Sequence, residues 1–239
     1  MESSALPQSA SDRYPKAAGP IHTIFVLAVL GGWTFWGKVL ADQLRAAANP
    51  NRLRFYVVTL CFEWFLFVLV VAGVRRSGAP LLIVLGDRWD SVRQVMRDIG
   101  IAAAFWLVSS GLLLILGRLL RIAALGRNMD FILPHGAAEI TLWLALSVTA
   151  GICEEAIYRG YLQRQFMAMT RNAPIGILLQ ASAFGLAHSY QGWHGAVAIA
   201  IEGALLGALA YWRKSVRPGM ISHAWKDALA PLLMSLPKH

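Results

Sequence analysis

The chain has 239 residues, of which 57% are hydrophobic and only 15% are charged, and its mean hydropathy is +0.53. Soluble domains carry about a quarter of their residues as charges, so this composition excludes an ordinary soluble domain and indicates a polytopic membrane protein. The net charge of +9 does not indicate a nucleic-acid partner, because Lys and Arg gather in short segments between apolar runs, as in cytoplasmic loops. The expected partner of these loops is the lipid bilayer.

Residues 1–20 are rich in Ser, Ala and Pro and predict a disordered tail. The remainder, residues 21–239, is predicted to form a single transmembrane helical domain of the all-α class. Its length and apolar runs predict about seven spans, within a range of six to eight. The expected spans are residues 21–40, 55–74, 101–117, 137–170, 173–188, 195–212 and 218–236.

Residues 87–98 lie between the second and third spans and have apolar side chains at helical spacing, which predicts an amphipathic helix on the membrane surface. With seven spans, the more basic connections fall on the same side as the N-terminus. We therefore expect an integral, multi-pass protein with a cytoplasmic N-terminus. Cys61 and Cys153 lie within apolar runs and are expected to be unpaired.

Two adjacent glutamates and an arginine stand within the fourth predicted span, where burial of a charge is unfavourable. Glu155 and Arg159 are four residues apart, so they share one helix face and can pair. Glu154 points about 100° away and is free to act as a general base on a water in a cavity. Taken alone, the Glu155–Arg159 pair is more often a structural ion pair.

Histidines in two later spans complete a possible polar pocket. His188 follows Phe184 by four residues, and His223 precedes Asp227 by four, so each pair shares a helix face. His223 and Asp227 can bind one ion or one water, or Asp227 can orient His223. Taken alone, His188 is equally compatible with an interfacial position at the end of a span, and His223 with a capping or snorkelling position near Pro218.

Two further carboxylates lie within apolar runs, at Glu63 and Glu202. We expect Glu63 to form a hydrogen bond between helices rather than to take part in catalysis. Glu202, on a helix rich in small residues, is a secondary candidate for the site.

Three ordered blocks resemble the signature of the CPBP intramembrane protease family, which includes type II CAAX prenyl endopeptidases and bacteriocin-processing proteins of the Abi type. The blocks are Glu154-Glu155-x-x-x-Arg159, Phe184-x-x-x-His188 and His223-x-x-x-Asp227. The resemblance covers residues 134–236. It implies that Glu154 is the catalytic base and that Glu155 and Arg159 support it. It also implies that His188 places or polarises the water, that His223 belongs to the third motif, and that Asp227 stands where the family has Asn or Asp.

The resemblance implies an intramembrane endopeptidase of the glutamic or the metallo type. In the metallo type, Glu154, His188 and His223 would bind Zn²⁺; in the glutamic type no cofactor is needed. The expected substrate is a peptide or protein segment near the membrane, including the prenylated C-terminal tail of a lipidated protein. One alternative is a non-catalytic scaffold of the immunity type that binds a partner. A small transporter is another, although the sequence shows no inverted repeat.

Overall fold

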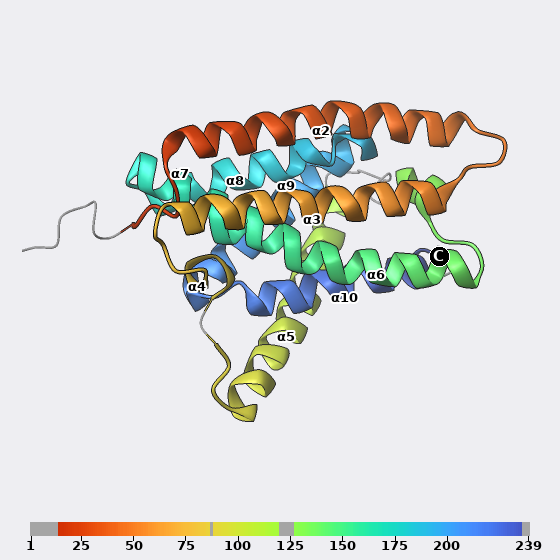
Figure 1. The fold of residues 1–239 in the computed structure, drawn as a ribbon. Helices are drawn as coiled ribbons and strands as arrows, with labels where there is room; N and C mark the ends of the chain where they lie inside the picture. Colours follow the sequence, from red (N-terminus) through yellow and green to blue (C-terminus); the bar gives the residue numbers. More distant parts are fainter. Residues whose placement is uncertain (1–13, 87, 120–126, 236–239) are drawn as a thin grey trace, which may run out of the picture.

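The computed structural model describes residues 14–86, 88–119 and 127–235, which form helices and connections without a β-strand (Figure 1). The predicted all-α class is therefore confirmed. The α-helices are α2 (Pro20–Ala46), α3 (Arg52–Arg76), α4 (Leu82–Leu85), α5 (Val92–Leu119), α6 (Ala137–Glu154), α7 (Gln163–Thr170), α8 (Ala173–Ala187), α9 (Trp193–Arg213) and α10 (Arg217–Ser235). A π-helix, η2 (Glu155–Leu162), joins α6 to α7, and two 3-10 helices are η1 (Arg127–Ile132) and η3 (Ser189–Gln191).

Each predicted span corresponds to a helix, but the number of membrane-crossing helices differs from the prediction. Within the described part of the chain, five helical stretches are long and apolar enough to cross a bilayer: α2, α3, α5, the run Ala137–Thr170, and α9. The helix α8 has only 15 residues, which is shorter than a bilayer crossing requires. The helix α10 has 19 residues, but it carries His223, Lys226 and Asp227 and is less apolar. The seven predicted spans are therefore all helical, and five of them are candidates to cross the membrane.

The fourth predicted span is a continuous helical run over Ala137–Thr170, as expected, but its central turns are not α-helical. In η2 the backbone N–H of Gln163 donates to the carbonyl of Tyr158, five residues earlier. Turns of this type are rare and are frequent at functional sites. All of Glu155–Leu162 is buried, so the π-helix lies inside the bundle and includes Glu155 and Arg159.

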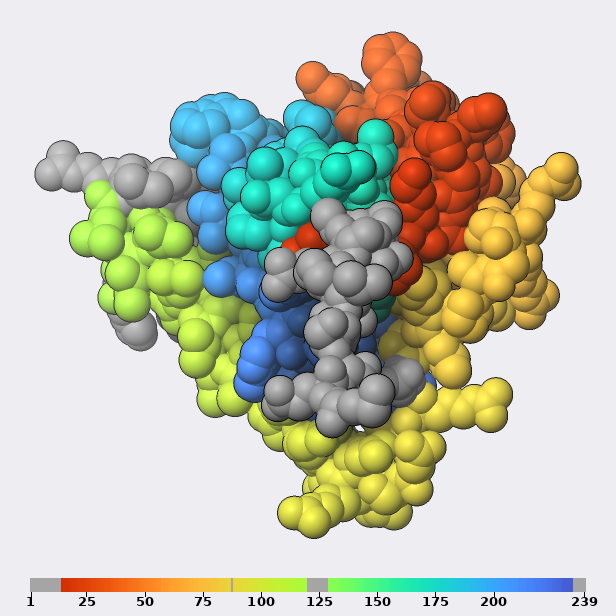
Figure 2. Space-filling model, turned by 90° about the vertical axis from the view of Figure 1, so that its left-hand side faces the viewer, coloured from red at the N-terminus to blue at the C-terminus, as the bar shows by residue number. Residues whose placement is uncertain are grey.

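The separate surface helix predicted for residues 87–98 is wrong, because Val92–Leu119 is one helix. Gly100, just after the predicted surface segment, does not end the helix. Asp98 is buried, and its carboxylate accepts hydrogen bonds from Trp89 Nε1 at 2.9 Å and Arg213 Nη2 at 3.2 Å. The polar face therefore contacts α9. The N-terminal turns of α5 project from the rest of the bundle (Figures 1 and 2).

The first 13 residues of the predicted tail lie outside the described part of the chain. The last residues before α2 are anchored rather than free. Gln165 Oε1 accepts hydrogen bonds from the backbone N–H of Ala17 at 2.7 Å and of Ala18 at 3.2 Å, and both alanines are buried. The start of α2 is thus fixed against α7.

Close helix contacts at glycines hold the four helices that carry the candidate site. A Cβ atom on Gly151 of α6 would lie 2.7 Å from the carbonyl oxygen of Met220 in α10. A Cβ atom on Gly185 of α8 would lie 2.5 Å from the carbonyl oxygen of Ala196 in α9. Small residues allow helices in membranes to approach in this way. The contacts determine how far α6 lies from α10 and α8 from α9.

Candidate active site

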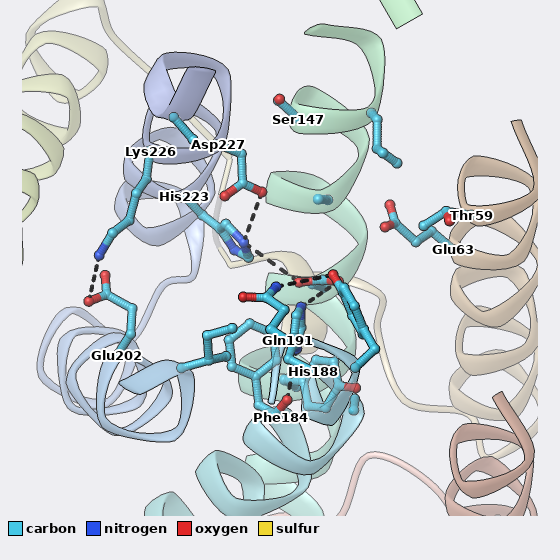
Figure 3. A pocket seen from close by; sticks show the side chains of 18 of the residues that line it. Thr59, Glu63, Ser147, Phe184, His188, Gln191, Glu202, His223, Lys226 and Asp227 are labelled. Carbon is cyan, nitrogen blue, oxygen red and sulfur yellow. Dashed lines mark hydrogen bonds and ion pairs between the residues drawn. The ribbon is translucent and has the colours of Figure 1, made fainter. Parts of the chain in front are cut away.

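The three sequence blocks meet at a cavity of about 310 Å³ inside the helix bundle (Figure 3). Glu154 reaches it from the end of α6, His188 from the end of α8, and His223 and Asp227 from α10. Glu155 and Arg159 do not line this cavity and lie behind it in η2. The six residues singled out from the sequence therefore form one cluster. Its open part, which lines the cavity, is Glu154, His188, His223 and Asp227, and its sealed part is the buried pair Glu155 and Arg159.

The Glu154 carboxylate lies between two imidazoles. Its Oε1 atom is 3.9 Å from His188 Nε2, and its Oε2 atom is 3.6 Å from His223 Nε2. Both separations exceed a direct hydrogen bond, and polar groups at such distances are commonly linked through water. The side chains of Glu154 and His188 are 16% and 15% exposed, so both are accessible from the cavity. The three groups can therefore share one water molecule.

The spacing of Phe184 and His188 has a direct structural reason. His188 is the C-cap of α8, and its Nδ1 atom lies 2.9 Å from the carbonyl oxygen of Phe184, four residues earlier. A carbonyl oxygen only accepts, so Nδ1 carries the proton and donates it. In the neutral ring this leaves the lone pair on Nε2, which faces Glu154.

Glu155 connects the sealed part of the cluster to His223. Its Oε1 atom accepts hydrogen bonds from Arg159 Nη1 at 2.8 Å and from His223 Nδ1 at 2.9 Å. The Glu155 and Arg159 side chains have no exposed surface. The carboxylate fixes the ring of His223 so that Nε2 faces the cavity, as carboxylates behind ligand histidines do in other sites. Asp227 does not have this position: its Oδ2 atom is 3.5 Å from Nε2 of His223.

The ring of Phe184 packs against several members of the cluster. The Arg159 guanidinium lies 4.1 Å above the centre of its ring, a cation–π contact. The rings of His188 and His223 lie 4.7 Å and 6.0 Å from it, both in edge-on arrangements. The ring of Tyr158 lies edge-on to that of Phe184 at 4.8 Å, and Tyr158 also lines the cavity. One aromatic side chain therefore contacts all three sequence blocks.

Among the other polar side chains that line the cavity, four carry a charge or a phenol. Glu63 is 7% exposed, and its Oε2 atom has no hydrogen-bond partner among the described residues, so the expected bond between helices is not made by that oxygen. Glu202 and Lys226 form an ion pair at 2.8 Å. Tyr190 in η3 is the fourth, and burial raises the pKa of its phenol, which therefore remains a donor.

Sequence reasoning assigned no role to Lys226 or Tyr190. The signal for Lys226 was present, because an ionisable residue in an apolar helix is a functional candidate in its own right. The position of Tyr190 carried no such signal, since it lies in a short connection whose course depends on the ends of α8 and α9.

The proposed zinc ligands have suitable donor types but not a suitable arrangement. Two imidazole Nε2 atoms and a carboxylate would suit Zn²⁺. Within the described part of the chain, however, no group of three His, Cys, Asp or Glu side chains is placed to hold one metal ion. We therefore assign no step of the chemistry to a metal. Both cysteines are free, as expected, and Cys153 is buried.

Comparison with known families agrees with the three blocks. Residues 136–229 match the model of the Rce1-like family, described as type II CAAX prenyl endopeptidase Rce1-like. The matched region includes all six candidate residues, from Glu154 to Asp227. No curated protein and no solved structure matches the chain. The resemblance to the CAAX proteases is thereby confirmed for these residues, and together with the long apolar helices it supports an integral membrane protein.

Proposed function

We propose that this protein is an intramembrane endopeptidase that hydrolyses a peptide bond with a water activated by Glu154. The observation that carries the proposal is the Glu154 carboxylate between the Nε2 atoms of His188 and His223, at 3.9 and 3.6 Å, in a cavity of the bundle. A carboxylate in this position accepts a proton from a water that the imidazoles help to orient.

The reaction proceeds by direct attack of water. Glu154 takes one proton from the water as its oxygen bonds to the scissile carbonyl carbon, and the carbonyl oxygen becomes an oxyanion. Collapse of this intermediate breaks the carbon–nitrogen bond, and Glu154 returns the proton to the departing amine. The products are a carboxylic acid and an amine, so atoms and charge balance. No covalent acyl-enzyme forms.

The histidines and their supports have separate roles in this reaction. His188 faces the carboxylate with Nε2 and helps to place the water. His223 is held by Glu155 through Nδ1 and, when protonated on Nε2, donates to the oxyanion. Asp227, 3.5 Å from the same Nε2 atom, stabilises that protonated form.

The substrate we propose is the C-terminal tail of a lipidated or membrane-anchored protein, including a prenylated one. The family description and the position of the cavity inside a membrane bundle support this class. We further propose that the end of the bundle that carries the N-terminus faces the cytoplasm, because its connections are rich in Lys and Arg.

The proposal is tested by peptide cleavage with the purified protein in detergent, read by mass spectrometry. The substrates are a pool of membrane-anchored and prenylated peptides, and Glu154→Gln is the matched variant. We expect cleavage by the wild type and a loss of roughly a hundredfold or more in the variant, which keeps the shape but not the base. Equal cleavage by both would refute the assignment of Glu154.

The same cleavage assay distinguishes a glutamic-type from a metallo-type enzyme and tests the scaffold alternative. Treatment with a zinc chelator leaves a glutamic-type enzyme active, whereas a metallo-type enzyme loses activity and regains it on addition of Zn²⁺. If the folded wild type cleaves nothing in the pool, the alternative of a non-catalytic scaffold that binds a partner gains support.

A further inference from the structure

A buried ion pair in the cavity wall has no part in the water activation described above. Lys226 Nζ lies 2.8 Å from Glu202 Oε2, so the pair joins α10 to α9. Ser109 Oγ of α5 donates to the other oxygen of Glu202 at 3.2 Å. Figure 3 shows this pair beside His223 and Asp227 but pointing away from them.

Lys226 faces a cavity whose other charged side chains are mostly carboxylates. It is the one Lys or Arg among the described residues that line the cavity. Four carboxyl groups line the same space: Glu63, Glu154, Glu202 and Asp227. Lys226 is therefore the one Lys or Arg side chain with which an anionic ligand in this cavity can pair.

A protein tail of the proposed class brings such an anion into the cavity. Its last residue carries a carboxylate, and burying that group without a cation is strongly unfavourable. A chain extends by at most roughly 3.5 Å per residue, so the end of a short tail remains close to the bond that Glu154 attacks. The end of the tail therefore needs a cation in the cavity wall.

We infer that Lys226 binds the C-terminal carboxylate of the substrate tail, an inference that rests on the proposed function. Glu202 neutralises the ammonium group while the cavity holds no tail. When a tail enters, its carboxylate replaces Glu202, which keeps the hydrogen bond from Ser109. Neither Lys226 nor the tail is then left as an unpaired charge in a membrane protein.

The test compares two peptides that differ only in a free or an amidated C-terminus. For the wild type, we expect kcat/KM to be roughly 10- to 100-fold higher for the free acid, the range of a charge-assisted hydrogen bond. Lys226→Met should bring this ratio close to one, and Lys226→Arg should retain most of it. Lys38→Met is the matched control, because Lys38 is exposed on α2 and does not line the cavity; it should leave the ratio unchanged.

A purely structural ion pair between α9 and α10 gives a different result. Lys226→Met would then lower cleavage of both peptides equally, and an unchanged acid-to-amide ratio would overturn the inference. If Lys226→Met does not fold, Glu202→Gln provides the test. It removes the competing carboxylate and should lower KM for the free acid but not for the amide; equal effects on both would again overturn the inference.

Failure of the proposed function remains separable from failure of this inference. If the wild type cleaves neither peptide, their binding is measured by fluorescence anisotropy with Glu154→Gln, with and without Lys226→Met. Tighter binding of the acid that disappears with Lys226→Met supports the carboxylate site even without cleavage. Equal binding of acid and amide rejects it.

Discussion

Glu155 has two partners, Arg159 and His223, and so has two expected roles: to stabilise the fold and to hold His223 in place. The effect of variants on stability and on activity separates these roles. The side chains of Glu155 and Arg159 have no exposed surface, and the two groups meet at 2.8 Å. Removing one member of such a pair leaves a buried charge without a partner, which costs roughly 3 to 5 kcal/mol. In a chain of this size, Glu155→Gln should lower Tm by roughly 6 to 20 °C.

The second role appears in a double variant. Glu155→Leu combined with Arg159→Met removes both charges, and apolar replacements of a buried pair are often neutral or stabilising. We expect this variant to regain most of the lost Tm. It should not regain peptidase activity, because His223 Nδ1 then lacks the acceptor that it has at 2.9 Å in the wild type.

Thermal unfolding in detergent and peptide cleavage, measured on the same preparations, check both statements. Asp42→Asn is the matched control: Asp42 also pairs with an arginine at 2.8 Å, but its side chain is 57% exposed. A surface pair contributes about 1 kcal/mol or less, so this variant should scarcely change Tm. An unchanged Tm in Glu155→Gln, or an active double variant, would refute the reasoning.

Two further variants test how the site is held. Gly151→Leu should abolish cleavage, because a Cβ atom there would lie 2.7 Å from an α10 carbonyl oxygen and would push His223 away from Glu154. Gly31→Leu is its control, since nothing lies within 4 Å of a Cβ at that position, and cleavage should be unchanged. Asp227→Asn should keep activity within about tenfold, because the amide keeps an acceptor oxygen beside His223; a steady-state rate far below that would show that the negative charge is required.

Much of the architecture was predictable because it depends on local pattern. Apolar runs and their ends gave the helices, and the four-residue spacing of Glu155 and Arg159 gave their contact, observed at 2.8 Å. The same four-residue spacing predicted that Phe184 and His188 lie on one helix face, where their rings are 4.7 Å apart. The count of spans was less predictable, because hydropathy finds α8 and α10 as apolar segments but does not show that one is too short and the other too polar.

The remaining features depend on contacts between distant segments. The segment η2 has only eight residues, which are too few to distinguish the hydrophobic period of a π-helix from that of an α-helix. The π-helix was therefore not predicted. The contact of His223 with Glu155 rather than Asp227 joins residues 68 positions apart. The burial of Asp98 against α9 likewise could not be read from residues 87–98, whose pattern alone is that of a surface helix.

We expect the two adjacent glutamates to differ in function, because they differ in what surrounds them. Glu155 shares one oxygen between Arg159 and His223 and has no exposed surface, so it is committed to holding other groups. Glu154 makes no direct hydrogen bond to either imidazole and is open to the cavity, so its carboxylate is free to exchange a proton with a bound water. Gly160 helps to fix this arrangement, because a Cβ atom there would collide with the carbonyl of Val84 in α4. The π-helix thereby buries one carboxylate among its partners and leaves the other open to the cavity, although the two are chemically identical and adjacent in sequence.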